Sequence, residues 1–415
     1  MRRTAIVAAV RTPVGRIRGC LSSVPAHTLA SLAIREAVKR AGLHGEEIDE
    51  VIYGNLYAHD ISNMARYALL DAGLPLGVPG ITVDRRCGTS LTAAALGDAL
   101  IRSGDADCVL VGGVESDSNR PYVLMQQNRL HDMAPPMFRG KSMLAPDEIG
   151  NPHMGITAEN IAEKYGISRE DCDAYAVDSH RKAVAAWAAG RFDDQIVPVP
   201  VLDKNGAVQK TVQMDDVFRR DCTMETLGKL KPAFKANGVA TAGNSSPNSD
   251  GASAVILMEA EKAKSLGCTV MGYVAGFASI GVDPSYMGLG PIFATRKLLK
   301  KAGRSMGGID IIEMNEAFAP QSIACIRDLE MDISKVNPNG GAIALGHPLA
   351  ATGGILVTKL VYEMNRQDLG LGLVTFCCGG GQGISLLIER YARPIWLLSA
   401  SILIRGNIRE RITRS

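Results

Sequence analysis

Short aliphatic runs alternate with helix-like segments from the start of the chain, and this alternation limits the fold more than any other feature. Strands are predicted at residues 4–10, 50–54, 80–84 and 108–113, and helices at 29–41, 64–72 and 89–103. This order is typical of an α/β fold in which helices cover both faces of a mostly parallel sheet. The 44 glycines and the low aromatic content of 5% agree with many tight strand-to-helix turns.

The alternation breaks between about residues 118 and 248 and then returns. The break is rich in Met, Pro and charge, with helices predicted at 158–165 and 171–189. Beyond it, IDIIEMN (309–315) resembles IDEVIYGN (48–55), and the strand that ends at Gly112 and Gly113 has a counterpart within 373–381. Segments repeated in the same order indicate a duplicated α/β unit. We expect a first half at 1–117 completed by about 249–268, an inserted domain at 118–248, and a second half at 269–390.

The bulk properties exclude several classes of protein. The 415 residues, 46% hydrophobic and 21% charged, suit two or three packed domains. A formal net charge of +2 argues against a nucleic-acid partner. The apolar runs at 4–10 and 395–404 are too short to cross a bilayer, so we expect no membrane span. Nine irregularly spaced cysteines read as thiols in a reducing compartment, which favours the cytoplasm.

Cys87 lies between a predicted strand and a predicted helix, in the segment DRRCGTS (84–90). A thiol at this point meets the free N–H groups and the positive dipole end of the helix, which stabilise a thiolate. We therefore expect a nucleophile with a lowered pKa. The alternative is a buried structural cysteine, which is the usual role of a cysteine taken alone.

His347 has the strongest functional case among the seven histidines. It lies in NPNGGAIALGHP (337–348), at the position of the second half that corresponds to Cys87. Taken alone, it could equally be a capping or packing histidine. Five others have no such context and are expected to be surface or structural residues: His27, His44, His59, His131 and His180.

Two further segments place reactive or polar groups at strand ends. In FCCGGG (376–381) the glycines can bring backbone N–H groups close to an anion. Cys377 and Cys378 could form a metal pair or a strained disulfide, but no second thiol pair completes a zinc site, so we expect no metal. In NEAFA (315–319), Asn315 and Glu316 could hold a water or an oxyanion, or could be a helix cap.

Together these four segments resemble the thiolase family, in the branch of acetyl-CoA C-acetyltransferases and 3-oxoacyl-CoA thiolases. The resemblance runs from about residue 4 to 390 and includes GGVES (112–116), MGITAE (154–159), TAGNSS (241–246) and GA (251–252). It implies a duplicated, five-layered α-β-α-β-α core with an inserted irregular loop domain that binds coenzyme A. It also implies condensation of acetyl-CoA to acetoacetyl-CoA, or thiolysis of 3-oxoacyl-CoA, in fatty acid metabolism and β-oxidation.

The resemblance assigns catalytic roles. Cys87 is acylated, His347 deprotonates it, and Cys377 exchanges the proton of the reacting carbon. Asn315 holds a water that forms one oxyanion hole with His347, while the backbone N–H groups of Cys87 and Gly379 form the other. A Claisen condensation needs a nucleophile, a base and stabilisation of two oxyanions. These groups meet that need without a permanently bound cofactor.

Coenzyme A and acetyl-CoA are expected as substrates that lie over the inserted domain. By the resemblance, Ser246 contacts the pantetheine arm and Arg219 is a candidate contact for the nucleotide phosphates. The expected lining of the pantetheine and acyl pocket is His153, Met154, Phe234, Ala242, Met287 and Phe318. The Met and Phe side chains among them could equally be core packing.

Several residues depart from the family's pattern without removing a catalytic group. Arg86 stands where an apolar or amide residue is common, Thr89 replaces a serine, and Ala350 replaces a glycine. Pro247 and Asn248 also replace a more apolar pattern. These departures bear on substrate preference.

Other readings remain open from the sequence. A ketoacyl synthase would use a second histidine where Cys377 stands. A non-catalytic acyl-CoA binder would need none of the four catalytic side chains. A cysteine hydrolase would leave Cys377 unexplained. Relatives form dimers or tetramers, so we expect a homodimer or homotetramer. Residues 391–415 form an extra tail with five arginines and one glutamate, either a partner or membrane-surface segment or an unpacked extension, which we favour.

Overall fold

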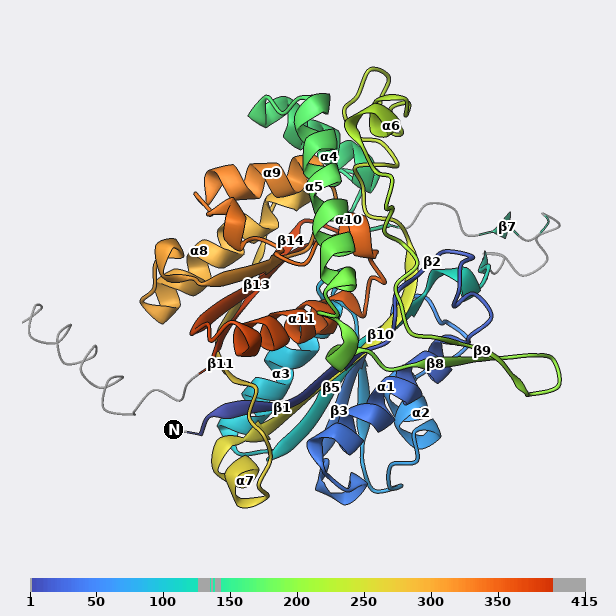
Figure 1. Cartoon of the computed structure of the whole chain (residues 1–415), viewed down its shortest axis with the longest axis vertical. Coiled ribbons are helices and arrows are strands. Elements are labelled where there is room, and N and C mark those ends of the chain that lie inside the picture. Colours follow the sequence, from blue (N-terminus) through green and yellow to red (C-terminus); the bar gives the residue numbers. More distant parts are fainter. Residues whose placement is uncertain (1, 126–134, 136, 139–142, 391–415) are drawn as a thin grey trace, which may run out of the picture.

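Two half-sheets of the same topology meet in the centre of the molecule (Figure 1). The structure is a computed structural model that describes residues 2–125, 135, 137–138 and 143–390. His131 and the tail expected at 391–415 lie outside the described residues. The described strands include a ten-stranded sheet in the order β12-β13-β14-β11-β1-β10-β5-β3-β4, with β2 paired to β10.

The predicted strands and helices of the first half are confirmed, with small shifts at their ends. Its strands are β1 Thr4–Arg11, β2 Gly15–Arg16, β3 Glu50–Gly54, β4 Gly80–Val83, β5 Cys108–Ser116 and β10 Ser249–Glu259. Its helices are α1 Ala26–Ala41, α2 Met64–Asp71, α3 Thr89–Ser103 and α7 Ala260–Ser265. The second half contains β11 Gly272–Gly281, α8 Gly290–Ala302, β12 Ile311–Met314, α9 Ala319–Asp328, α10 Ala342–Leu345, α11 Thr352–Arg366, β13 Leu371–Cys378 and β14 Gln382–Glu389.

The expectation of a mostly parallel sheet is wrong. Only the outer strands pair in parallel, β3 with β4 and β5, and β12 with β13. The inner pairs are antiparallel, because β13 and β14 are joined by a tight glycine turn and β10 returns against β5 after the insertion. The strand–helix–strand alternation that predicts parallel pairing covers only part of each half.

The duplication is visible in the sheet order. The series β3-β5-β10-β1 of the first half matches β12-β13-β14-β11 of the second, with the same parallel and antiparallel senses. The two halves join where Ala5 and Ile6 of β1 pair with Tyr273 and Gly272 of β11. Equivalent loops of the two halves therefore come from equivalent ends of one continuous sheet.

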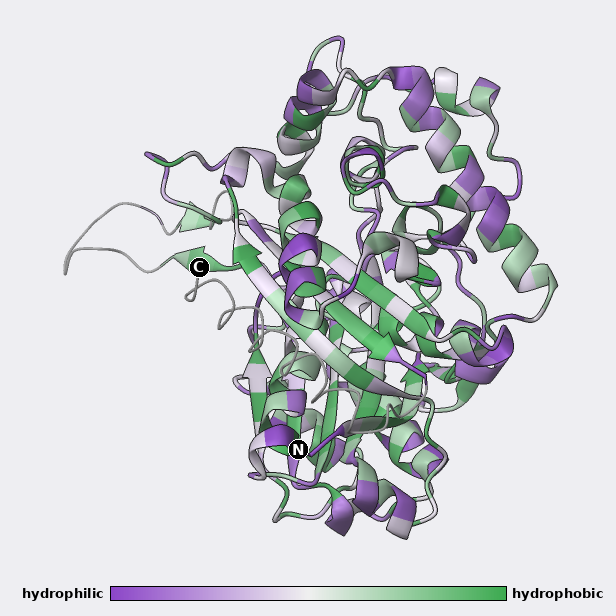
Figure 2. Ribbon diagram, turned by 90° about the vertical axis from the view of Figure 1, so that its left-hand side faces the viewer, coloured by the Kyte–Doolittle hydropathy of each residue, from purple (hydrophilic) through white to green (hydrophobic). Residues whose placement is uncertain are grey.

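Five layers follow from the way the apolar faces are buried. Side chains of α1 and α2 pack on one face of the first half-sheet, and those of α8 and α9 pack on the second half-sheet. Between the half-sheets, α3 and α11 share one apolar cluster with strands of both. Figure 1 shows this succession, and Figure 2 shows the mainly hydrophobic central strands beside helices with hydrophilic faces. The predicted five-layered fold class is confirmed.

The segment between β5 and β10 is more regular than expected. It contains α4 Met154–Tyr165, α5 Arg169–Ala188 and α6 Met224–Gly228, with short strands β6 Leu124–Met125, β7 Met137–Phe138, β8 Val199–Leu202 and β9 Val208–Val212. Ser168 and Asp171 form a capping box that starts α5. Arg11 of β1 makes a fully buried ion pair with Asp215 at 2.8 Å, so the segment is anchored to the central sheet.

Candidate active site

The starts of α3 and α11 lie against each other between the two half-sheets. The Gly354 N–H donates to Ser90 Oγ at 2.9 Å, and a Cβ added to Gly353 would lie 2.3 Å from the Leu91 nitrogen. Cys87 directly precedes the start of α3, and His347 lies in the loop before α11. The duplicated topology therefore carries the predicted nucleophile and the predicted base to one end of the same helix pair.

Cys87 faces the glycine turn after β13. The Gly379 backbone N–H hydrogen-bonds the Cys87 sulfur and lowers the pKa of the thiol, but burial outweighs this bond and the pKa is raised above its usual value. The expected depressed pKa is therefore contradicted. Gly88, rather than Cys87, caps the helix, so the thiol lies one residue outside the first turn. A neutral thiol in this position needs a base at the moment of attack.

His347 is that candidate base, and its hydrogen bonds define its tautomer. The Thr352 hydroxyl donates to the Pro348 carbonyl at 2.8 Å, so its oxygen accepts from His347 Nδ1 at 2.7 Å. Nδ1 then carries the proton and Nε2 keeps its lone pair. Burial lowers the pKa of His347 to about 4, so the ring is neutral at neutral pH. Sequence reasoning missed Thr352, whose only local signal is a hydroxyl at the start of the helix after His347.

Asn315 and Glu316 have different surroundings. Asn315 Nδ2 lies 3.3 Å from His347 Nε2, and the buried Asn315 Oδ1 has no hydrogen-bond partner within the described structure. Glu316, in contrast, accepts hydrogen bonds from Ser179 Oγ at 2.7 Å and Asn337 Nδ2 at 2.8 Å. Of these two polar side chains, Asn315 is therefore the one whose free Oδ1 can accept a hydrogen bond from a water beside His347, while Glu316 bonds to neighbouring segments.

The two adjacent cysteines point to opposite faces of β13. Cys377 joins an apolar cluster with Met287 and Phe318, whereas Cys378 is buried with strands and helices of the central layer. Burial raises the pKa of Cys377 well above its usual value, and the nearby Cys87 raises it further. Cys377 is thus a neutral thiol next to the nucleophile and the apolar cluster, which suits it to deliver a proton.

Most of the expected pantetheine and acyl contacts gather around Cys377. His153 stacks on Phe234 with ring centroids 5.3 Å apart, Phe234 meets Phe318 edge-on at 5.9 Å, and Met154 and Met287 join the same cluster. The Ser246 hydroxyl donates to the Ala317 carbonyl at 3.1 Å, which fixes this loop against the segment after β12.

Two of the predicted contacts, Ala242 and Arg219, are exposed and lie outside that cluster. The Arg219 backbone N–H donates to Nδ1 of the buried His180 at 3.1 Å, which supports a structural role for His180. These positions do not test whether Ala242, Arg219 and Ser246 contact a ligand. The three contacts stay predictions.

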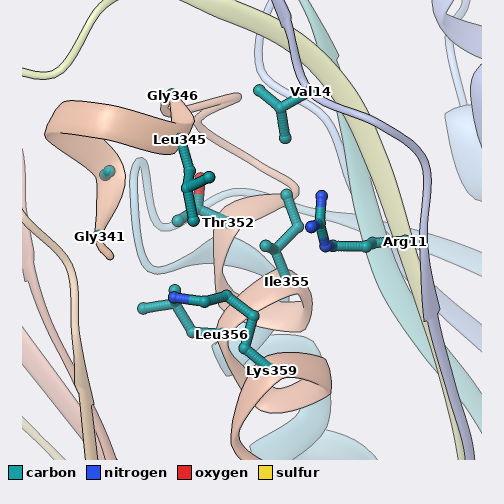
Figure 3. Close-up of a pocket in the computed structure, with 10 residues that line it drawn as sticks. Arg11, Val14, Gly341, Leu345, Gly346, Thr352, Ile355, Leu356 and Lys359 are labelled. Atoms are coloured by element: carbon teal, nitrogen blue, oxygen red, sulfur yellow. The ribbon is translucent and has the colours of Figure 1, made fainter. Parts of the chain in front are cut away.

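A small cavity lined by Gly346 and Thr352 is not the substrate site. Figure 3 shows it between Arg11, Leu345 and four residues of α11, namely Thr352, Ile355, Leu356 and Lys359. Its volume of about 10 Å³ is close to that of a single water and far below what an acyl group needs. Lys359, which lines this cavity, donates to Glu313 and to the Gly340 carbonyl at 2.6 and 2.7 Å. This buried ion pair joins α11 to β12.

The described residues contain no group of three or more His, Cys, Asp or Glu side chains placed to hold a metal ion. Across the same part of the chain, no helix has both the length and the apolar character required to cross a membrane.

Comparisons with known proteins agree with this geometry. The family model described as the thiolase N-terminal domain matches residues 4–261, and the thiolase C-terminal domain matches residues 268–390. An acetyl-CoA acetyltransferase from Pseudomonas aeruginosa is 46% identical over 402 residues, covering 94% of this chain and 100% of its own. An acetyl-CoA acetyltransferase from Allochromatium vinosum is 44% identical over 388 residues, covering 93% of this chain and 98% of its own.

Solved structures are also similar. The acetyl-CoA acetyltransferase of Bacillus anthracis matches with a TM-score of 0.88 at 39% identity, over 94% of this chain and 99% of its own. Human mitochondrial 3-ketoacyl-CoA thiolase in complex with CoA matches with a TM-score of 0.88 at 38% identity, over 94% of this chain and 98% of its own.

Proposed function

The chain belongs to the thiolase family, and on that premise we propose that it is a CoA-dependent acyltransferase. It cleaves 3-oxoacyl-CoA with free CoA and, in reverse, condenses acetyl-CoA to acetoacetyl-CoA. The observation that carries the proposal is the set of Cys87, His347, Asn315, Cys377 and the Gly379 N–H at the junction of the two halves. Relatives named acetyl-CoA acetyltransferase and a thiolase solved with CoA support the same activity and substrate.

In the first half-reaction of thiolysis, His347 Nε2 takes the proton of Cys87 while the sulfur attacks the 3-oxo carbonyl. The bond between the second and third carbons then breaks, and the departing carbanion takes the proton of Cys377. Acetyl-CoA leaves, and Cys87 carries the remaining acyl group. The raised pKa of Cys377 supports this role, because the group is a thiol before reaction and becomes a donor only to a strong base such as a carbanion.

In the second half-reaction, free CoA loses its thiol proton to the Cys377 thiolate and attacks the acyl group. The Cys87 thiolate leaves and recovers its proton from His347. Both thiols and the neutral imidazole are restored, so the cycle needs no permanently bound cofactor. Each carbonyl becomes an oxyanion during attack, which the Gly379 and Cys87 N–H groups or a water held by Asn315 would stabilise.

The finer assignments belong to the same proposal. Ser246, Phe234, Phe318 and their neighbours bind pantetheine, and Arg219 contacts the nucleotide phosphates. The chain divides into two halves at 1–117 and 269–390, with 249–268 completing the first and a CoA-binding insertion at 118–248. We place the enzyme in the cytoplasm as a homodimer or homotetramer that acts in fatty acid metabolism, including β-oxidation.

Thiolysis with purified protein tests the activity. We expect acetoacetyl-CoA to disappear only when free CoA is present, with two acetyl-CoA formed per substrate. Cys87→Ala should abolish turnover, while Cys268→Ala, which removes a partly buried thiol elsewhere, should retain it. Release of acetoacetate without added CoA would indicate a hydrolase instead, and turnover by Cys87→Ala would refute the assigned nucleophile.

A further inference from the structure

A polar cleft of about 430 Å³ is lined by Arg86, the residue before Cys87, and has no part in the catalytic steps above. Its lining comes from the loops that follow three neighbouring parallel strands: Tyr57 after β3, Arg86 after β4, and Asp117 and Arg120 after β5. The carboxyl ends of parallel strands are the usual place for ligands in α/β folds. Tyr57 also packs on Ala350, in the loop that carries His347.

Arg86 connects this cleft to the reacting centre. It directly precedes Cys87 and adopts a left-handed backbone with φ of 51°, which is uncommon outside glycine. A Cβ built on Gly379 would lie 3.7 Å from Arg86 Cγ and 3.3 Å from Leu144 Cδ1, so these two side chains lie beside Gly379. The head of Arg86 turns away into the cleft, where Nη2 donates to Tyr57 Oη at 2.9 Å.

Two guanidinium groups converge on Tyr57. The Arg120 guanidinium carbon lies 3.8 Å from the centre of the Tyr57 ring, and that of Arg86 lies 5.4 Å from it. Among the described residues no carboxylate oxygen lies within 4 Å of the Arg120 guanidinium, although the charge of Arg120 acts to lower the pKa of Asp117. The Tyr57 ring contacts both cations, and apart from the Arg86 Nη2 bond to Tyr57 Oη it leaves their N–H groups able to bind an anion.

The carboxyl groups of the cleft compensate these cations only in part. Asp84 Oδ2 is 3.8 Å from Arg86 Nη1, beyond hydrogen-bond distance, and its side chain is half exposed. Burial raises the pKa of Asp117 to about 6, and it raises the pKa of Glu115, on the strand before Asp117, well above its usual value. His59 also lines the cleft. The cleft thus retains binding capacity for a negatively charged group.

We propose, building on the proposed function, that this cleft receives the far end of the acyl group and selects short 3-oxoacyl-CoA substrates that carry a terminal carboxylate. The acyl carbonyl has to meet the Gly379 N–H, and the chain beyond it then passes between Arg86 and Leu144 into the cleft. The terminal carboxylate accepts hydrogen bonds from Arg86 and Arg120. The Arg86 side chain runs from beside Gly379 to its guanidinium group in the cleft. The acyl group has to cover the same short distance, so its chain is short.

The test compares thiolysis of 3-oxoadipyl-CoA with that of 3-oxohexanoyl-CoA, which have equal chain length but end in a carboxylate and a methyl group. In the wild type we expect kcat/KM to be at least about tenfold higher for the carboxylate substrate. Arg120→Gln and Arg86→Leu should each lower this ratio about tenfold. The ratio within each variant cancels any general loss of activity. Lys39→Gln, which removes an exposed charge on α1, should leave the ratio unchanged.

The outcomes separate this proposal from the proposed function. Cleavage of neither substrate by the wild type would refute the thiolase activity itself. Cleavage of both with equal kcat/KM, or an unchanged ratio in Arg120→Gln, would refute the carboxylate subsite and leave the activity standing. If Arg86→Leu does not fold, the Arg120→Gln ratio alone decides.

Discussion

At the scale of single residues, the hydroxyl of Thr352 decides which nitrogen of His347 carries the proton. Because this hydroxyl donates to Pro348, it can only accept from Nδ1. We expect Thr352→Val to lower kcat on the order of tenfold with little change in KM, since part of the imidazole then has its proton on Nε2. Thr352→Ser should restore most of the rate. Equal losses in both variants would show a packing role instead.

The opposite orientations of Cys377 and Cys378 lead to a second prediction. With acetyl-CoA, Cys377→Ala should still acylate Cys87, because no proton leaves carbon in that step, but condensation should fall on the order of 10²–10⁴-fold. Mass spectrometry should detect a stable acetyl adduct on Cys87. Cys378→Ala, which changes the buried face of β13, should retain condensation in the fraction that folds. Normal condensation by Cys377→Ala would assign the proton transfer to another group.

At the scale of secondary structure, the close approach of α3 and α11 brings together the segments before these helices, which carry Cys87 and His347. Gly353 permits that approach, because an added Cβ would overlap the backbone of Leu91 and the hydroxyl of Ser90. We expect Gly353→Ala to cost about 1–3 kcal/mol in the free energy of unfolding, measured with urea, and to lower thiolysis of the folded protein.

The matched control is Gly307→Ala. A Cβ added at Gly307 meets no atom within 4 Å, so this variant should keep wild-type stability and activity. Equal stability of the Gly353 and Gly307 variants would mean that the helices can separate without cost, and that the helix contact does not position the two catalytic groups.

At the scale of the whole molecule, buried neutral histidines make stability depend on pH. Burial lowers the pKa of His180 from 6.5 to about 4. As pH falls through this range, His180 binds a proton in the unfolded chain but not in the folded chain. The stability advantage that wild type has over His180→Gln should therefore shrink by about 3 kcal/mol between pH 6.5 and 4.

Urea unfolding of both proteins across this pH range measures the difference and cancels the contributions of the buried carboxyl groups. Leu76→Gln, at an exposed position without a titratable group, is the control and should follow wild type at every pH. A difference between wild type and His180→Gln that does not change with pH would show that His180 titrates alike in the folded and unfolded chains.

Much of the architecture could be read from the sequence, because it depends on short-range patterns. Aliphatic periodicity placed β3 and α3, and the similarity of residues 309–315 to 48–55 revealed the duplication that the sheet order bears out. The same patterns misjudged strand direction, since a tight turn or a long insertion between two strands decides their sense and leaves no periodic trace.

The sequence by itself determined the family, the fold class and the segments that carry Cys87, His347 and Cys377. Only the tertiary structure decided that the Cys87 pKa is raised rather than lowered, that Thr352 sets the His347 tautomer, and that Arg86 and Arg120 share one cleft. The physical reason is that motifs and periodicity act over a few neighbouring residues. Desolvation and the meeting of distant side chains depend on how the whole chain packs.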